Sequence, residues 1–494
     1  MGGEVIRSIR RSFGFSFFPG IGSTVPSGNV NIRPIRTNLT DTIIAPATPP
    51  GVGAIAVLRL SGPRAIELVN AAFSAKDLSR QKSHTVHYGT LRDQNHALLD
   101  EVLVTLFVAP RSYTGEEVVE ISCHGSDYIV RRLLEYFVDA GARFAQPGEF
   151  TLRAFLNGRM DLSQAEAVAD LIASQSAGSH EVALRQLRGG FRNEIQALRE
   201  RLIHFASLIE LELDFGEEDV EFADRTELRE LVEQLLARIR QLLDSFRLGN
   251  ALRRGISTVI AGRPNAGKST LLNALLNEER AIVSDVAGTT RDTIEEPLVI
   301  EGIEFRLIDT AGIRDARDQI EAIGVQRTLE KVRTGRLLVY VYDVNELGPE
   351  TVRADLEQLR NEHDGDQAGR VLVVGNQTDR YAGTPPIPTD DPTILMSALQ
   401  QTQLDELRAA LLRVALDGKT SLDQTLVTNT RHYEALRRAA TSLQDVLRGL
   451  ADGITGDFVA MDIRQALHHL GEITGEVSSD DLLDRIFRDF CIGK

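Results

Sequence analysis

The sequence predicts a multidomain protein with α+β and α/β parts, in which a small α+β domain precedes a helical domain that carries an inserted α/β domain. Three observations predict this fold: a phosphate-binding loop in mid-chain, proline-free stretches on both sides of it, and short β-type runs nearer the amino terminus. A chain of 494 residues is long enough for about three domains. We expect an amino-terminal extension, an α+β domain, a first helical segment, the α/β domain and a second helical segment over residues 1–40, 41–157, 158–252, 253–418 and 419–494.

The α+β domain is predicted from three apolar runs separated by loops with proline and glycine. These runs are Ile55-Ala-Val-Leu-Arg-Leu60, Leu103-Val-Thr-Leu-Phe-Val108 and Val118-Val-Glu-Ile-Ser122. Their lengths are typical of strands.

The helical domain is predicted from the distribution of proline, which is absent between Pro147 and Pro264 and again after Pro392. Both stretches are rich in Leu, Ala, Glu and Arg and place apolar residues at helical spacing. One such set consists of Leu198, Leu202, Ala206, Ile209 and Leu213. Because the two stretches flank the α/β segment, we expect one helical domain with that segment inserted into it.

The segment Gly262-Arg-Pro-Asn-Ala-Gly-Lys-Ser269 has the spacing of a phosphate-binding loop. An apolar run precedes it and a leucine-rich helical pattern follows, which is the context the motif requires. Backbone N–H groups at a helix N-terminus hold phosphate oxygens, Lys268 adds a positive charge, and the Ser269 hydroxyl can ligate Mg²⁺. The expected nucleotide contacts here are Asn265, Ala266, Gly267, Lys268, Ser269 and Thr270.

Two later strands indicate which nucleotide is bound. The first, Ile303-Glu-Phe-Arg-Leu-Ile-Asp309, brings Asp309 to the metal, and the expected contacts continue through Thr310, Ala311 and Gly312. The second ends in Asn376-Gln-Thr-Asp379, where a carboxylate at Asp379 pairs with two donors of guanine and repels adenine. A loop with Ser397 and Ala398 then closes over the base. These motifs predict a GTPase, although Gln377 replaces the usual lysine and is expected to lower affinity.

Hydrolysis needs a group that orients water, and Ile313 occupies the position of the usual glutamine. Candidates lie in the acidic stretch Arg314-Asp-Ala-Arg-Asp-Gln-Ile-Glu321. The first switch is expected before the Asp309 strand, with Thr290 as the second hydroxyl ligand of Mg²⁺. Its expected GTP contacts are Ser284, Asp285, Val286, Ala287, Gly288, Thr289 and Thr290.

Several further motifs extend over residues 41–494 in one collinear pass. They are Asp41-Thr-Ile-Ile-Ala-Pro-Ala-Thr-Pro-Pro-Gly51, Ser112-Tyr-Thr-Gly-Glu-Glu117, Pro147-Gly-Glu-Phe150, Phe155-Leu-Asn157, Asp161-Leu-Ser-Gln-Ala-Glu166, Gly288-Thr-Thr-Arg-Asp292 and Phe490-Cys-Ile-Gly-Lys494. Together with the phosphate loop they resemble the MnmE (TrmE) family of tRNA modification GTPases. The resemblance implies a tetrahydrofolate-binding-like front domain and a Ras-like GTPase domain inserted into the helical domain.

The resemblance also implies site roles. Potassium is held by Asn265, Ser284, Val286 and Thr289, and Glu321 joins Lys268 as a catalytic residue by orienting water. A folate related to 5-formyl-tetrahydrofolate is held by Arg59, Glu120, Arg159 and Lys494; some relatives have lysine in place of Arg159. Cys491 is either an inert exposed thiol or a residue that acts near the modification chemistry.

Partners are implied as well. The net charge of −16 is unfavourable for binding tRNA alone. The family acts as a homodimer, joined by its front domain, within a heterotetramer or larger complex with the flavoprotein MnmG (GidA). That partner supplies FAD and NADH, and the pair adds an aminomethyl or carboxymethylaminomethyl group at C5 of the wobble uridine. No apolar run is long enough for a membrane span, so we expect no membrane partner.

Other interpretations stay open. A ribosome-assembly or signalling GTPase of the Era or Der type shares the phosphate loop, but lacks the folate-like front domain and the Cys-Ile-Gly-Lys tail. A folate-dependent one-carbon transferase with a regulatory GTPase is the third hypothesis. Residues 1–40 contain five arginines and one acid, Glu4. They are a mitochondrial transit peptide, an overextended start or a disordered tail; without a transit peptide we expect a cytoplasmic protein.

Overall fold

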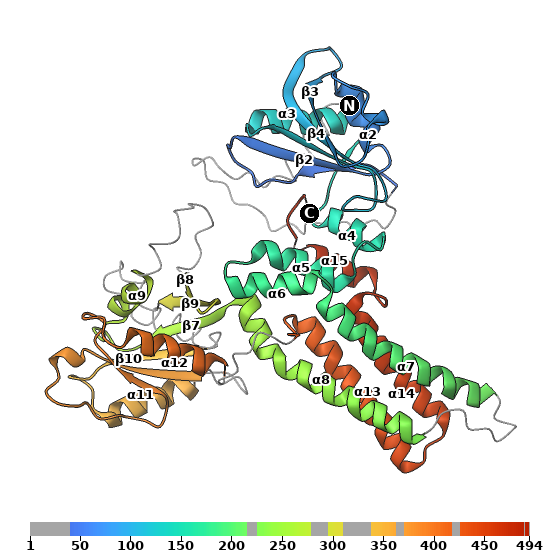
Figure 1. The fold of residues 1–494 in the computed structure, drawn as a ribbon. Coiled ribbons are helices and arrows are strands. Elements are labelled where there is room, and N and C mark those ends of the chain that lie inside the picture. The colour runs from blue at the N-terminus through green and yellow to red at the C-terminus, as the bar shows by residue number, and fades with distance from the viewer. Residues whose placement is uncertain are drawn as a thin grey trace, which may run out of the picture. The chain divides into compact units, whose positions relative to one another are not determined.

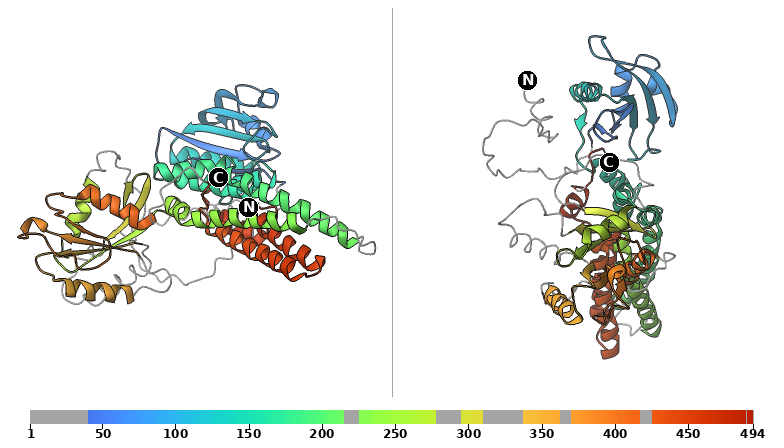
Figure 2. Two further views of the ribbon diagram at one scale, coloured as in Figure 1. Left: turned by 60° about the horizontal axis from the view of Figure 1, so that its bottom comes forward. Right: turned by 90° about the vertical axis from the view of Figure 1, so that its left-hand side faces the viewer.

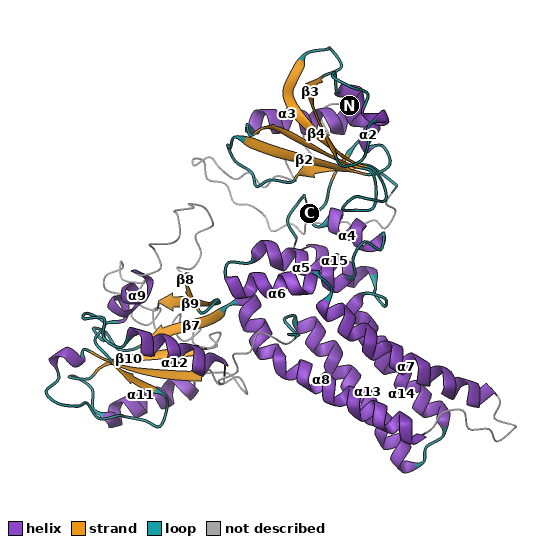
Figure 3. Ribbon diagram, in the orientation of Figure 1, coloured by secondary structure: helices purple, strands orange, loops and turns teal. Residues whose placement is uncertain are grey.

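The computed structural model describes residues 40–214, 225–277, 295–309, 337–361, 370–416, 425–488 and 490–493. Figure 1 shows the course of the chain and Figure 3 colours the same view by secondary structure. The element order places a sheet-containing domain first, then helices α5 to α8, a second sheet, and a return to helices α13 to α15. This order confirms the predicted combination of α+β, helical and inserted α/β parts.

The amino-terminal domain contains a six-stranded sheet in the order β3-β4-β5-β2-β1-β6. All of its pairings are antiparallel except the parallel pair of β1 and β6. Helices α2 and α3 contact the sheet. The elements are β1 Ile43–Pro46, β2 Ile55–Ser61, α2 Ala65–Ala72, η1 Leu78–Arg80, β3 Thr85–Arg92, β4 Leu98–Phe107, β5 Val118–His124, α3 Asp127–Asp139 and β6 Arg143–Phe144.

The three strand predictions in this domain are confirmed as β2, β4 and β5. Strand β4 begins at Leu98, five residues before the start of the predicted apolar run at Leu103. The additional residues pair with β3, where Arg92 lies opposite Leu98. Cross-strand pairing therefore extends the strand beyond its apolar stretch.

The helical domain is assembled from two separate chain segments. Helices α7, α8, α13 and α14 run along one another (Figures 1 and 2) and share one core of buried leucine, isoleucine, valine and alanine side chains. Local signals set the helix ends: Asp161 accepts from the Gln164 N–H at 2.8 Å at the start of α5, and Gly453 ends α13 with φ 67°. The helices are α4 Glu149–Leu156, α5 Leu162–Ala173, α6 Ala177–Leu187, α7 Gly190–Asp214, α8 Arg225–Arg254, α13 Thr430–Asp452, α14 Gly456–Thr474 and α15 Asp480–Arg488.

A buried charged group joins the two segments; we call it the Glu166 cluster, made of Glu166, Asp170, Arg253, Arg431 and His432. The Arg431 guanidinium donates to both carboxylate oxygens of Glu166 at 2.9 and 3.0 Å, and His432 Nε2 lies 2.8 Å from Glu166 Oε2. Arg253 Nε donates to Asp170 at 2.7 Å. Burial raises the pKa of Glu166, but the charges and hydrogen bonds of His432 and Arg431 more than offset burial and lower it to about 2.

The inserted domain has a six-stranded sheet in the order β12-β11-β10-β7-β9-β8, parallel except for β8. Side chains alternate along β10: Leu337, Val339 and Val341 pack with α9 and α12, whereas Leu338 and Tyr340 pack with α11. Helices therefore cover both faces. The elements are β7 Ile256–Ala261, α9 Lys268–Asn277, β8 Glu295–Ile300, β9 Ile303–Asp309, β10 Leu337–Asp343, α11 Pro349–Asn361, β11 Arg370–Asn376, η3 Thr378–Arg380, β12 Thr393–Leu395 and α12 Leu404–Leu416.

One short junction and two hydrogen bonds connect this domain to the helices. Gly255, with φ 70°, is the single residue between α8 and β7. On the return, the Val427 N–H donates to Ser245 Oγ of α8 at 3.0 Å. The Gly178 N–H of α6 donates to the Gly302 carbonyl in the β8–β9 turn at 3.1 Å.

Within the described residues, no helix is both long and apolar enough to span a bilayer.

Candidate functional site

The phosphate loop connects β7 to α9 in the predicted strand, loop and helix order. Gly262 has φ 150°, and a Cβ there would lie 2.0 Å from the Val341 carbonyl oxygen. Gly267 has φ 89°, and its Cβ would lie 2.3 Å from Asn376 Nδ2. Both positions therefore require glycine, for backbone conformation and for space. The resulting loop lies at the N-terminus of α9, where backbone N–H groups favour an anion.

Within the loop, the Lys268 ammonium donates to the carbonyls of Gly262 and Arg263 at 2.8 and 2.9 Å. The Lys268 side chain therefore folds back over the phosphate loop and bonds to its first two residues. Ser269 and Thr270 are exposed in the first turn of α9, and Asn265 is exposed with φ 63°. A hydroxyl in this position is suited to a hard cation beside phosphate.

Asn376 joins the phosphate loop to the predicted base-binding loops. Its side chain is 2% exposed, donates to the Ala266 carbonyl at 2.9 Å and accepts from the Ala398 N–H at 2.9 Å. The buried Ser397 is fixed in turn, since its N–H donates to Thr402 Oγ1 at 2.9 Å. One amide thus brings together three segments that the sequence assigned to one nucleotide.

Gln377 has a specific place in this assembly. Its backbone is left-handed, with φ 64°, and its Nε2 donates to the Asn265 carbonyl at 3.1 Å. Its own carbonyl accepts from Asn345 Nδ2, also at 3.1 Å. Asp379 is exposed in the η3 turn that follows. The residue that departs from the usual lysine therefore still lies against the phosphate loop.

The predicted switch residues lie outside the described part of the chain. At the end of β9, Asp309 lies opposite Ile260 of β7, directly before the phosphate loop. The remaining predicted contacts lie outside the described residues: Ser284, Asp285, Val286, Ala287, Gly288, Thr289, Thr290, Thr310, Ala311, Gly312, Glu321 and Lys494. The described part of the site therefore comprises the phosphate loop and the base loops.

In the amino-terminal domain, Arg59 of β2 lies directly opposite Glu120 of β5. The guanidinium contacts Glu120 Oε1 at 2.8 and 2.9 Å and donates to the Gly493 carbonyl at 3.4 Å. It also lies over the rings of Tyr113 and Phe150, 5.5 and 5.7 Å from their centroids. Both charged side chains are partly exposed, so this pair is open to a ligand.

Arg159 and Arg59 both lie beside Tyr113, and among the described residues no hydrogen bond or ion pair joins the two arginines. Arg159 is exposed and lines a cavity of about 460 Å³ together with Tyr113, Ser112 and Arg111. Cys491 is exposed, and its carbonyl accepts from the Gly148 N–H at 3.4 Å. The tail is therefore held against the turn that begins α4.

Sequence reasoning assigned no role to several residues that build these sites. Tyr113 and Phe150 lie within two of the motifs quoted above, and their place in those motifs was the available signal. Thr402 and Asn345 had no signal, because their contacts depend on loop conformation. Asn376 was predicted as a nucleotide contact, but its role in joining the loops was not.

Comparison with known proteins agrees with this architecture. A family model described as the MnmE helical domain matches residues 162–491, and one described as the GTP-binding protein TrmE N-terminus matches residues 42–159. A tRNA modification GTPase MnmE of Cytophaga hutchinsonii is 54% identical over 460 residues, covering 93% of this chain and 99% of the relative. Those of Christiangramia forsetii and Flavobacterium psychrophilum are 51% and 50% identical, each covering 92% of this chain and 100% and 99% of the relative. The chain therefore belongs to the MnmE family of tRNA modification GTPases.

Proposed function

We propose that this chain is a potassium-stimulated GTPase that, with a flavoprotein partner of the MnmG type, modifies C5 of the wobble uridine of certain tRNAs. The one-carbon unit comes from a tetrahydrofolate, and FAD and NADH belong to the partner. The observation that supports the nucleotide part most strongly is the Asn376 amide, which holds the phosphate loop and the Ser397–Ala398 loop together. We also propose that the domains of this protein span residues 41–157, 158–252, 253–418 and 419–494, after an extension over residues 1–40.

GTP binding is assigned to the phosphate loop and the base loops. Asp379 selects guanine, and Lys268 with the loop N–H groups holds the phosphates. Ser269 and Thr290 hold Mg²⁺, and Asn265, Ser284, Val286 and Thr289 hold K⁺. Bound cations neutralise charge that develops on the transferring phosphoryl group. The exposed positions of Ser269 and Asn265, on either side of Lys268, support this division.

Glu321 orients the attacking water, because Ile313 offers no polar group. Two GTPase domains then pair face to face across a homodimer, which couples hydrolysis to a change in the helical domain. The Gly178–Gly302 hydrogen bond supports such coupling, since the β8–β9 turn leads directly along β9 to Asp309.

Folate binding is assigned to Arg59, Glu120, Arg159 and Lys494. A pterin offers adjacent donors that suit a carboxylate, and the folate glutamate needs cations. The partly exposed Arg59–Glu120 pair and the nearby cavity lined by Arg159 support this assignment. Cys491 is close to the same domain through its contact with Gly148, which supports a role near the modification chemistry.

The first experiment compares GTP hydrolysis by the purified chain in potassium and in sodium buffer at equal ionic strength. We expect potassium to accelerate hydrolysis at least about tenfold, roughly 1.4 kcal/mol of transition-state stabilisation. Glu321→Ala should remove most hydrolysis in potassium and leave GTP affinity nearly intact. Asp318→Ala, which changes another carboxylate of the same segment, is the matched control and should retain both.

The outcomes separate the parts of the proposal. Equal rates in the two buffers would contradict the potassium mechanism and leave the GTPase assignment unchanged. Loss of GTP binding in Glu321→Ala would make that residue structural. A second assay, reconstitution of tRNA modification with the flavoprotein and a labelled folate, tests the carbon transfer itself.

A further inference from the structure

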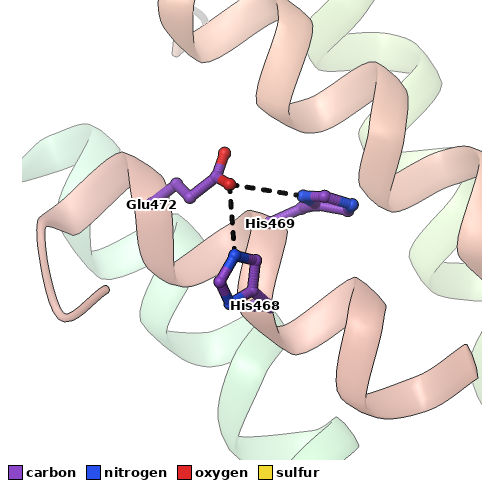
Figure 4. A group of neighbouring side chains, drawn as sticks. All are labelled: His468, His469 and Glu472. Atoms are coloured by element: carbon purple, nitrogen blue, oxygen red, sulfur yellow. Dashed lines mark ion pairs between the residues drawn. The ribbon is translucent and has the colours of Figure 1, made fainter. Parts of the chain in front are cut away.

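Helix α14 carries two adjacent histidines and a glutamate whose side chains converge near its carboxyl end. Figure 4 shows His468, His469 and Glu472, with the two rings pointing to the same carboxylate oxygen. His468 Nε2 lies 3.3 Å from Glu472 Oε1, and His469 Nδ1 lies 3.6 Å from it. All three ligand atoms lie within 4.8 Å of one another.

These separations suit a metal ion better than direct hydrogen bonds. An N–H···O hydrogen bond in a protein spans about 2.7–3.2 Å between heavy atoms. Two ligands of a tetrahedral zinc ion, each about 2.0–2.2 Å from the metal, lie about 3.3–3.6 Å from each other. Both measured nitrogen-to-oxygen distances fall in the second range.

A second observation concerns His469 alone. Its Nδ1 is buried and makes no hydrogen bond within the described residues. A buried polar nitrogen without a partner is unfavourable, so this atom needs a ligand.

The neighbouring helix fixes the carboxylate. Arg438 of α13 donates to Glu472 Oε2 at 2.5 Å, and the other oxygen, Oε1, faces the histidines. The Glu472 backbone carbonyl accepts from Arg431 of the Glu166 cluster. Such contacts orient a ligand before the ion binds. A cation here also lies in the last turns of α14, the negative end of the helix dipole.

From this geometry we propose that His468, His469 and Glu472 bind one first-row transition-metal ion of the zinc class, with a fourth position open to water. Two imidazoles and one carboxylate favour Zn²⁺, Co²⁺ or Ni²⁺ over Mg²⁺ or Ca²⁺. All three ligands lie on α14, and Glu472 is also held by Arg438 of α13, so binding of the ion stabilises the carboxyl end of α14 within the helical domain. This site is separate from the nucleotide and folate sites.

The test uses the full chain without a histidine tag. Zn²⁺ is titrated against a chromophoric chelator, and Co²⁺ is followed by its visible absorption, which is intense in tetrahedral coordination. We expect one ion per chain and a rise in melting temperature with Zn²⁺. The double variant His468→Ala/His469→Ala should lower affinity more than about 100-fold, and Glu472→Gln more than about tenfold.

The matched control is His204→Ala, which removes an exposed histidine from the neighbouring helix α7. It should bind Zn²⁺ as the unmodified chain does. Circular dichroism at 222 nm establishes that each variant is folded before titration. Zn²⁺ binding that survives the double variant unchanged, or the absence of any binding and of any change in melting temperature, would overturn the proposal.

Discussion

The phosphate loop and the Glu166 cluster treat polar groups in opposite ways. In the loop, two glycines and one amide fix the backbone that leads into the N-terminus of α9, where N–H groups favour an anion. In the Glu166 cluster, the carboxylates of Glu166 and Asp170 pair with Arg431, His432 and Arg253 inside the helical domain. A site that binds a ligand keeps its donors available and depends on backbone shape. In a structural site the charged groups bond to one another, so its stability depends on each of these partners.

The largest expected effect tests the structural side. Glu166→Gln removes the carboxylate that pairs with Arg431 in a largely buried place, and breaking such a pair costs about 3–5 kcal/mol. Hydrogen–deuterium exchange of α5 and α13 should accelerate accordingly. Glu181→Gln removes the partner of Arg185 in an exposed ion pair and should change exchange little. Equal effects in the two variants would remove the distinction between buried and exposed charges.

The pH dependence sharpens the same side. Because the pKa of Glu166 is lower in the folded chain, about 2, than its ordinary value of 4.5, its stabilisation is complete above pH 4.5. It is lost as the pH falls towards 2, and it amounts to at most about 3 kcal/mol. Acid unfolding followed by circular dichroism at 222 nm should therefore be shallower in Glu166→Gln than in the unmodified chain. Parallel curves would assign acid sensitivity to other groups.

The next effect concerns the binding side. Gly267→Ala places a methyl group 2.3 Å from Asn376 Nδ2 and should lower GTP affinity about 100-fold, roughly 2.7 kcal/mol. Gly383→Ala is the matched control, since Gly383 also has a positive φ, 100°, but a Cβ there meets nothing within 4 Å. Binding of a fluorescent GTP analogue measures both. If the two variants lost affinity alike, backbone strain rather than the Asn376 contact would be responsible.

The smallest effect tests an intermediate case. The Arg59–Glu120 pair is partly exposed, so Arg59→Met should change the free energy of unfolding by less than about 1 kcal/mol. Folate affinity, measured by calorimetry, should fall about tenfold or more. Arg64→Met, which breaks an exposed pair with Glu67, should leave folate binding unchanged. If Arg59→Met lost much stability but still bound folate, the Arg59–Glu120 pair would be structural, like the Glu166 cluster, and would not be a folate site.

Sequence reasoning succeeded where the signal was contiguous. The phosphate loop occupies eight consecutive positions, so its spacing could be recognised, and the strand ends at Asp309 and Asn376 followed from apolar runs. The Arg59–Glu120 pair joins residues 61 positions apart and was available only through family resemblance. The Glu166–Arg431 pair spans 265 positions and was not predicted. Such pairs are fixed by tertiary packing, which no local spacing encodes.

The hydrogen bond from Arg59 to Gly493 has a consequence for the order of synthesis. Its two partners are 434 positions apart. At a translation rate of about 5–20 residues per second, the last strand of the amino-terminal sheet, β6 Arg143–Phe144, is synthesised roughly 17–70 s before the Gly493 carbonyl. The sheet therefore completes its own pairing first, and Arg59 spends that interval with Glu120 as its partner. Docking of the tail is a late event in the biogenesis of each chain.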